Sequence, residues 1–505
     1  MKSLNGDICA IRFSTGTLHE VSEEFSLPDY MPEVRRIVSC SANVLPESKF
    51  IDSDEITLSG LVSYTLLYIG NDGKLTSAPL NSEYSVKLSC NGADLTGLTD
   101  EGILSATVIS STSHRATGPR KISLSARLHS RIFSVYGVKN EETVSCSFDG
   151  KDEPVSTADE LSLERSTVTI PSSNISCHSV TGTASGTFRE RAGSKVVACF
   201  AGGGITDVKL AADSVGIRGD AYITCLVTDE SGAYSTVRIK SPVEENISTG
   251  SRPPREIGND SASAILRCAG ISINEGSDGE FSWDMEYDIN VIRTEKRKAE
   301  VTDDIYSTKY ETETEHVALP SLVCLRNGNS RLTVSGSKQI SGGEGKQVKS
   351  SWGKVTIDKA DCTSDGNLRL MGSCSLNVIT VGDGEPTMEE IVLPVKFETA
   401  CEASDGERSV ICEAAVMYAD ARLDGGKLSV DAELCFSFFA YAACKTPHVG
   451  SCVIDKDRQV GLRGNCIKIY LPEPEEEMWD IGKRYHCEVR QITPVGTGGT
   501  VIIGD

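Results

Sequence analysis

The chain has 505 residues, and at about 150 residues per domain this length predicts roughly three to four domains. Hydrophobic residues make up 39% of the sequence, which is normal for globular proteins and excludes an intrinsically disordered chain. The 72 Asp and Glu residues outnumber the 50 Lys and Arg residues, so the net charge is −22. This balance argues against binding to nucleic acid or anionic lipid, and we expect basic or neutral partners.

The amino-terminal sequence MKSLNGDICAIRF lacks the apolar run of a secretory signal, and no apolar stretch of about 18 residues occurs in the chain. We therefore expect a soluble, cytoplasmic protein. Its 18 cysteines are spread singly from Cys9 to Cys487 without a C-x-x-C pair. We interpret them as reduced and mostly buried small hydrophobic residues. An oxidised, cross-linked assembly is the alternative.

Three copies of a strand, turn and strand unit follow one another along the chain, and each copy begins at a glycine. The leading glycines are Gly60, Gly219 and Gly372. Apolar residues alternate after each of them, which is typical of a strand with one buried face. The alternating residues are Val62, Tyr64, Leu66 and Tyr68 in the first copy, Ala221, Ile223, Cys225 and Val227 in the second, and Cys374, Leu376 and Val378 in the third.

A second glycine in each copy predicts the turn of a hairpin. Gly73, Gly232 and Gly384 follow the leading glycines by 13, 13 and 12 residues. The returning strands are predicted over 76–88, 235–247 and 388–399.

Each copy then carries a longer alternating strand. Such a pattern would place apolar groups all around a helix, so it favours a strand strongly. The residues are Ile122, Leu124, Ala126 and Leu128; Phe281, Trp283, Met285, Tyr287, Ile289 and Val291; and Leu428, Val430, Ala432, Leu434, Phe436 and Phe438. A repeat of about 155 residues matches one folding domain per copy. The predicted fold is mainly β, with three tandem β-sheet-rich domains.

Acidic and polar stretches at 139–162 and 298–316 separate the copies. We interpret these stretches as solvated linkers or guards of strand edges, and only secondarily as docking sites for a basic partner. The predicted domains are therefore 1–145, 146–305 and 306–460.

The carboxy-terminal segment, 466–505, has a different character. It predicts a short strand, an acidic helix start, a helical turn with Trp479, Ile481 and Tyr485, and a last strand over Val501 to Ile503. Three glutamates at 475–477 precede Lys483 and Arg484, an order that suits both ends of a helix dipole. We expect a small α+β module, in which Trp479 is more readily a core residue than a ligand stack.

Few of the parts needed for catalysis are present. The seven histidines, at 19, 114, 129, 178, 316, 448 and 486, show no spacing typical of metal ligands on a helix. The stretch GGEGKQ at 342–347 lacks the earlier glycine and the Ser or Thr of a phosphate-binding loop, so we interpret it as a polar turn. Neither G-x-S-x-G nor G-x-G-x-x-G occurs. We expect a protein that is not an enzyme and has no cofactor or metal.

The segment SLPDYMPEVRRIV at 26–38, followed by the glycine-led hairpin and the alternating strand, resembles the SPOCS domain of spore coat morphogenetic proteins from endospore-forming bacteria. Its Pro-Asp element occurs at Pro28 and Asp29 in the first copy alone. The segment EEEMWDIGKRYHCEVRQI resembles a degenerate LysM module. Both resemblances together cover most of the chain.

This resemblance implies a coat scaffold or adaptor in the mother cell, at the forespore surface. Its partner would be a SpoIVA-like ATPase of the coat basement layer. The partner-binding candidates are Trp479, Ile481, Lys483 and Tyr485. In LysM modules the loops around the helix form a saccharide groove, and here they differ, with Glu475 to Met478 at the helix start and PVGTGGT before the last strand. Protein docking is therefore favoured.

Two alternatives stay open. The first is a cell-envelope protein that binds peptidoglycan or chitin through the LysM-like tail. The second is a hydrolase whose paired carboxylates cannot be recognised without geometry.

Overall fold

The computed structural model describes residues 8–45, 47–99, 102–138, 145–148, 162–249, 260–382, 385–460, 467–473, 475–495 and 500–503. Most of these residues lie in antiparallel strands, which confirms the prediction of a mainly β fold. An α-helix, α2 (Met478–Tyr485), lies in the tail. Within the described ranges, no helix is long and apolar enough to cross a membrane.

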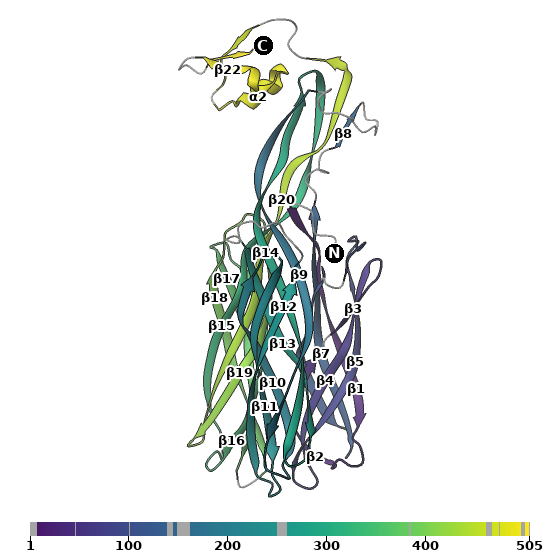
Figure 1. Ribbon diagram of the computed structural model, residues 1–505, viewed down its shortest axis with the longest axis vertical. Helices are drawn as coiled ribbons and strands as arrows, with labels where there is room; N and C mark the ends of the chain where they lie inside the picture. The colour runs from purple at the N-terminus through teal and green to yellow at the C-terminus, as the bar shows by residue number, and fades with distance from the viewer. Residues whose placement is uncertain are drawn as a thin grey trace.

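Six of the sheets form three sheet pairs with the same order of strands (Figure 1). In each pair, the first, sixth and fifth strands form one sheet, and the second, third and fourth form the other. Sheet pair 1 contains β1 (Ile8–Ser26), β2 (Val34–Val44), β3 (Ser48–Ile51), β4 (Glu55–Gly70), β5 (Leu75–Ser89), β6 (Leu104–Ala116) and β7 (Lys121–Val138), with β3 continuing β2 along β4. Sheet pair 2 contains β9 (Leu163–Arg189), β10 (Lys195–Leu210), β11 (Ser214–Thr228), β12 (Tyr234–Ser248), β13 (Asp260–Glu275) and β14 (Glu280–Ser307). Sheet pair 3 contains β15 (Tyr310–Gln339), β16 (Gln347–Cys362), β17 (Asn367–Val381), β18 (Thr387–Ala400), β19 (Glu407–Asp424) and β20 (Lys427–Gln459).

The glycines that mark the sequence repeat lie inside the third strand of each pair, not at its start. β4, β11 and β17 each begin five residues before Gly60, Gly219 and Gly372. Eight residues after each glycine, the pairing with the second strand shifts by one residue at a β-bulge. The three pairs therefore share a local kink as well as a strand order, because a bulge bends a strand at a fixed point.

The predicted hairpins are present. Gly73 and Gly232 have φ angles of +78° and +83°, a region in which a side chain would be strained. They connect β4 to β5 and β11 to β12, and β18 is the predicted returning strand of the third copy. Gly384 lies outside the described residues.

The interpretation of 298–316 as a linker is wrong, because this segment is strand. β14 continues to Ser307 and β15 begins at Tyr310, so a two-residue turn connects sheet pairs 2 and 3. Its charged residues alternate with buried ones, including Val301 and Ile305. Most of the other proposed linker, 139–162, lies outside the described residues.

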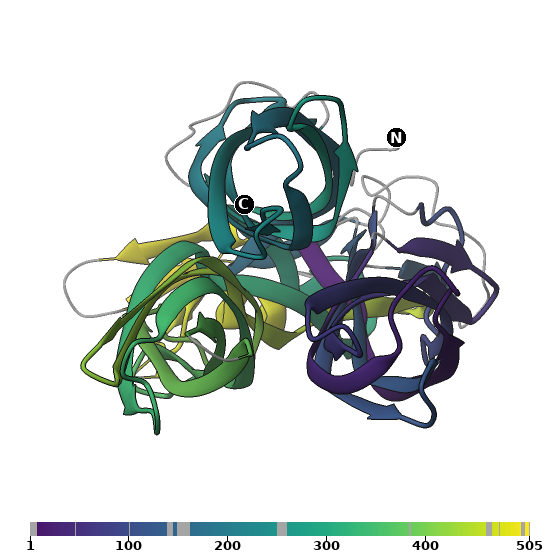
Figure 2. The ribbon, with the colours of Figure 1, turned by 90° about the horizontal axis from the view of Figure 1, so that it is seen from below.

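The three sheet pairs lie side by side around a common centre (Figure 2). Each pair encloses its own hydrophobic core between its two sheets. A further cluster joins all three, with Phe133 from β7, Ile292 from β14, and Phe439 and Tyr441 from β20. The rings of Phe133 and Phe439 lie 6.2 Å apart, edge to face.

An arm of long strands extends beyond the sheet pairs and ends at the tail (Figure 1). It is built from the ends of β9, β14, β15 and β20, with β8 (Ser145–Phe148) parallel to β20 at Ser451 to Ile454. Its core contains Ile305, Val449, Cys452 and Ile454. Ten residues of β15, from Tyr310 to Leu319, correspond to about 30 Å at the rise of a β-strand.

The cysteines follow the expected burial with one correction. Of the free cysteines that the structure describes, nine are buried and five are half-buried. Cys199 and Cys225 form a disulfide, however, so the expectation of reduced cysteines is wrong for this pair. The two residues are direct partners across β10 and β11, with Cα atoms 4.2 Å apart, which brings their sulfur atoms together.

Candidate functional site

The tail folds as a small sheet with the helix α2 on one face. Its strands β21 (Lys468–Tyr470), β23 (Thr500–Ile503) and β22 (Ile492–Val495) pair in that order, and a 3₁₀ turn (Val489–Gln491) precedes β22. The predicted first strand, helix and last strand are confirmed, whereas β22 was not predicted. Residues on the inner face pack against Ile481 of the helix: Tyr470, Ile492, Val501 and Ile503.

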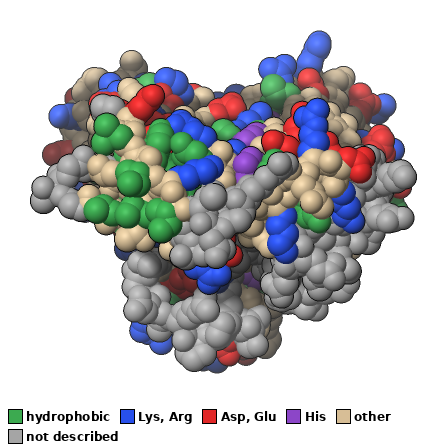
Figure 3. Space-filling view, turned by 90° about the horizontal axis from the view of Figure 1, so that it is seen from above, with side chains coloured by type: hydrophobic (Ala, Val, Ile, Leu, Met, Phe, Trp, Pro, Cys, Tyr) green, Lys and Arg blue, Asp and Glu red, His purple; other side chains and the backbone are tan. Residues whose placement is uncertain are grey.

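The outer face of this tail sheet is apolar and uncovered by the described residues. Ile467, Ile469 and Leu471 alternate along β21 and its flanks and are 72%, 76% and 68% exposed. Val495 on β22 is 43% exposed. On the end of the molecule that carries the tail, hydrophobic side chains gather on the side where the tail lies (Figure 3). We call Ile467, Ile469, Leu471 and Val495 the apolar tail face.

Two of the predicted partner-binding residues stay within the tail. Ile481 is 1% exposed and belongs to the core of the module. The Tyr485 ring lies 5.4 Å from the Tyr470 ring, and the Lys468 ammonium lies 4.8 Å above it. Both residues therefore hold the helix on the sheet.

The other two predicted residues, Trp479 and Lys483, attach the tail to the arm. Trp479 Nε1 donates a hydrogen bond of 2.9 Å to Asp304 on β14, and Lys483 Nζ lies 2.7 Å from the same carboxylate. Burial opposes ionisation of Asp304, but these two donors outweigh it and lower the pKa of the carboxyl group.

Tyr306, two residues further along β14, completes this contact. Its ring is fully buried and meets the Trp479 ring edge to face at 4.8 Å. Its hydroxyl donates to the Cys487 carbonyl at 2.8 Å. Burial raises the pKa of Tyr306, so the hydroxyl stays protonated and keeps donating.

Acidic side chains border the tail helix. Glu473, Glu475 and Glu477 are exposed. Glu476 is instead paired with Arg484 at 2.9 Å and accepts a hydrogen bond from the Tyr470 hydroxyl. Among the described residues, Glu473, Glu475 and Glu477 have no ion-pair partner, and Glu473 follows Leu471 of the apolar tail face by two residues. Such negative charge suits a partner with basic residues around an apolar contact.

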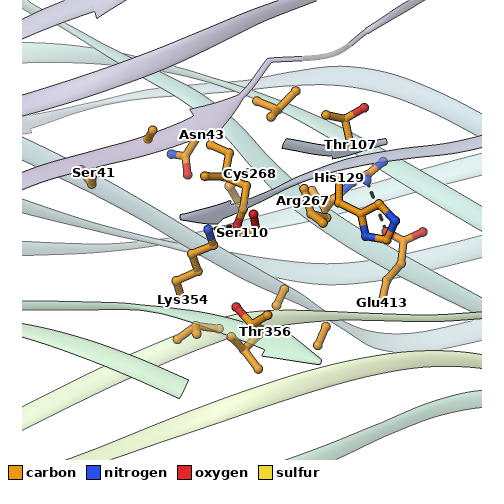
Figure 4. Close-up of a pocket in the computed structure, with 18 of the residues that line it drawn as sticks. Ser41, Asn43, Thr107, Ser110, His129, Arg267, Cys268, Lys354, Thr356 and Glu413 are labelled. Atoms are coloured by element: carbon orange, nitrogen blue, oxygen red, sulfur yellow. Dashed lines mark hydrogen bonds and ion pairs between the residues drawn. The ribbon is translucent and has the colours of Figure 1, made fainter. Parts of the chain in front are cut away.

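A second candidate site lies where the three sheet pairs meet. A cavity of about 1240 Å³ is lined by β2 and β6 of pair 1, β10 and β13 of pair 2, and β16 and β19 of pair 3. These strands lie at the ends of the strand order in their sheets, so the cavity is bordered by sheet edges. Figure 4 shows polar side chains from all three pairs converging on it. We call it the central cavity.

Arg267 lies at the centre of a charged cluster in the wall of the central cavity. Its guanidinium group lies 2.5 Å from Asp288 of its own sheet pair and 3.3 Å from Glu413 of pair 3. It also donates at 3.5 Å to the Ser105 carbonyl of pair 1. Burial opposes the charge of Arg267, but the two carboxylates outweigh this effect and raise its pKa. One side chain thus connects all three pairs.

Sequence reasoning missed the central cavity entirely. Its polar residues come from strands far apart in the chain, and none belongs to a recognisable motif. The signal that pointed toward it was the repeat itself, because three modules of one shape leave a space where their edges meet. Within the described ranges, no group of three or more His, Cys, Asp or Glu residues is arranged to hold a metal ion.

The chain was compared with protein-family models, with curated proteins and with solved structures, and none of them matches it.

Proposed function

We propose that this protein is a non-enzymatic scaffold or adaptor of the spore coat, with three SPOCS-like domains that correspond to the three sheet pairs and a LysM-like tail. This is the layout of the coat morphogenetic protein SipL. The scaffold would recruit or anchor a SpoIVA-like basement-layer ATPase at the forespore surface, from the mother-cell side.

The observation that carries this proposal is the apolar tail face at the end of the arm. Ile467, Ile469 and Leu471, on β21 and its two flanks, are each more than two-thirds exposed, and the exposed Glu473 follows in the chain. Contiguous exposed apolar residues with a polar rim are typical of a surface that binds another protein. The arm holds this surface about 30 Å from the sheet pairs, where a large partner can reach it.

The contacts of the tail helix favour protein docking over saccharide binding. Trp479 packs on Tyr306 and bonds to Asp304, so its ring serves the arm contact and not a sugar ring. In this proposal Trp479, Ile481, Lys483 and Tyr485 act on the partner indirectly, because they keep the apolar tail face in place. The partner itself contacts Ile467, Ile469 and Leu471.

The test changes the apolar tail face without touching the helix. We expect Ile469→Glu combined with Leu471→Glu to weaken binding of the purified basement-layer ATPase at least tenfold, since two charges would enter a desolvated contact. Binding is measured by surface plasmon resonance with the full chain, and recruitment by fluorescence microscopy of sporulating cells.

Val392→Glu is the matched control, because Val392 is also an aliphatic residue, 58% exposed, on β18 of sheet pair 3. It should leave binding unchanged. If the double variant still binds and localises like the unaltered protein, the tail face does not dock the partner and the proposal fails.

A further inference from the structure

The central cavity contains a cation that no described carboxylate neutralises. Lys354 reaches it from β16, and its ammonium donates a hydrogen bond to the Ile109 carbonyl of β6. None of the ion pairs among the described residues includes Lys354, although Arg267 in the same cavity has two carboxylate partners. An ammonium group without an ion-pair partner at a cavity wall attracts negative charge, so the site favours an anionic ligand.

The environment of Lys354 supports this reading independently. Surrounding protein atoms lower the pKa of its ammonium group to about 8, with burial as the cause. The side chain nevertheless keeps accessible surface, because it borders the open space of the cavity. Lys354 is exposed, so its ammonium is reachable from the cavity.

Groups that can donate hydrogen bonds lie around the same space. Thr356 lies beside Lys354 in Figure 4, and Asn43 reaches the same space from β2. Ser110 also lies there, but its hydroxyl donates to the Arg127 carbonyl at 3.0 Å. Ser110 is the extra residue of the bulge in β6, which bends the strand at this point. Hydroxyl and amide groups beside an ammonium are the donors that anionic oxygens require.

Part of the wall is apolar, and the rest carries hydroxyl and charged groups. Val355 on β16 and Val416 on β19, both half-buried, line the apolar part. A volume of about 1240 Å³ is ample for a small organic molecule, since ligand pockets commonly measure about 300–1,000 Å³. An inorganic anion alone would leave these apolar surfaces in contact with water.

We propose that the central cavity binds a small amphipathic organic anion, whose carboxylate or phosphate group pairs with Lys354 while its apolar part lies against Val355 and Val416. This inference does not depend on the proposed coat function, because the tail and the cavity lie at different ends of the arm. It gives the junction of the three sheet pairs a ligand that bridges them.

The test compares three ligands of one chain length on the full protein by isothermal titration calorimetry. Octanoate and octyl phosphate carry the two candidate head groups, and octanol is the neutral match. We expect one octanoate or one octyl phosphate per chain, and the tighter of the two identifies the head group. Octanol should bind at least tenfold more weakly than that anion, and equal binding of octanol would overturn the proposal.

Variants then assign the anion to Lys354. Lys354→Met should weaken the binding of the anion at least tenfold, whereas Lys354→Arg, which keeps the charge, should retain most of it. Lys359→Met is the control, because the exposed Lys359 lies on the same strand and pairs with the half-buried Asp361. No binding of either anion at about 1 mM, or equal binding by the Lys354→Met protein, contradicts the inference.

The lowered pKa of Lys354 also predicts how the affinity for the anion depends on pH. The anion requires the charged ammonium, so the affinity for octanoate, which stays ionised above about pH 6, should be constant between about pH 6 and pH 7 and fall about tenfold per pH unit above pH 9. The other ionisable groups bordering the cavity are the carboxylates of Glu47, Asp288, Asp358, Glu390 and Glu413, the cations Lys49, Arg131 and Arg267, the imidazoles of His114 and His129, and the thiols of Cys40, Cys268 and Cys412.

Carboxyl and guanidinium groups ordinarily titrate far outside this range. Burial lowers the pKa of His114 and His129, so these imidazoles titrate below the pH range in which the affinity falls. Burial raises the pKa of each of the three thiols to about 12. The fall in affinity near pH 8 should persist in the Lys359→Met protein. In the Lys354→Arg protein it should move upward by several pH units. If the affinity does not begin to fall near pH 8, the anion binds a cation other than Lys354.

A chemical readout covers the case in which Lys354→Met does not fold. In the unaltered protein, the bound anion should slow reductive methylation of Lys354 by formaldehyde and borohydride, measured by peptide mass spectrometry, and leave Lys359 unaffected. Equal rates at Lys354 with and without the anion contradict the inference.

Discussion

At the scale of single residues, the central cavity contrasts two cations, the half-buried Arg267 and the exposed Lys354. Arg267 is neutralised by Asp288 and Glu413, so its role is structural. Lys354 has a backbone carbonyl as its described partner, so its charge is available to a ligand. The contrast is physical, because the charge of a paired cation is already satisfied within the protein, whereas an unpaired cation beside an open cavity can attract an anion.

Removing Arg267 should destabilise the protein strongly. Arg267→Met leaves two poorly exposed carboxylates without their cation, which we expect to lower the free energy of unfolding by about 3–5 kcal/mol. Urea denaturation followed by circular dichroism measures the change. Arg189→Met is the control, because Arg189 is 80% exposed and its ion pair should contribute less than about 1 kcal/mol. Equal stability of the two variants would show that the cluster is not structural.

At the scale of elements, the three sheet pairs repeat a bent strand and not merely a sequence pattern. Beyond the bulge after the leading glycines, a second one lies in the fifth strand of each pair, at Ser110, Ala269 and Met417. The leading glycines lie where another backbone or ring comes close. A Cβ on Gly372 would collide with the Thr356 carbonyl of β16, and one on Gly219 would lie 2.9 Å from the Gly204 carbonyl.

The close approach of β16 and β17 should make Gly372 intolerant of substitution. Gly372→Ala should lower the free energy of unfolding by about 2 kcal/mol or more, because the obstacle is backbone that cannot rotate away. Gly60→Ala should cost less, since its obstacle is the Tyr84 ring at 3.0 Å. Gly216→Ala on β11, whose nearest atoms would lie 3.8 Å away, should be close to neutral. Thermal unfolding by calorimetry ranks the three, and a neutral Gly372→Ala would contradict this account.

At the scale of the whole molecule, the three sheet pairs pack against one another and are not independent domains joined only by linkers. The cluster around Phe133, Ile292 and Phe439 draws from all three pairs. The stacked rings of Phe200 and Trp352 join pair 2 to pair 3 at a centroid distance of 3.7 Å. Apolar contacts of this kind couple the folding of their parts, so we expect one cooperative transition.

Substitution of Phe439 should lower the stability of all three sheet pairs together. Phe439→Ala removes a fully buried ring and should cost about 3–5 kcal/mol. Circular dichroism and tryptophan fluorescence should still report coincident, single transitions at a lower urea concentration. Phe50→Ala is the control, since Phe50 is 67% exposed and should change the stability little. Separate transitions for the sheet pairs would disprove the shared core.

The sequence by itself determined the element type, the buried face of most strands and the turns. Alternation is a local property, since successive side chains of a strand point to opposite faces, and so Val62 to Tyr68 and Leu428 to Phe438 could be assigned without a structure. The tail helix was predictable for the same reason. Its acidic start and basic last turn reflect the dipole of the helix itself.

Only the tertiary structure decided the arm, the tail contact and the central cavity. The polar segment 298–316 was predicted as a linker because its burial comes from strands distant in the sequence. Trp479 could not be matched with Asp304, nor Lys354 with Ile109, because each pair is more than 170 residues apart in sequence. Alternation indicates which side of a strand is buried, whereas the identity of the segment that covers it depends on how whole sheets pack.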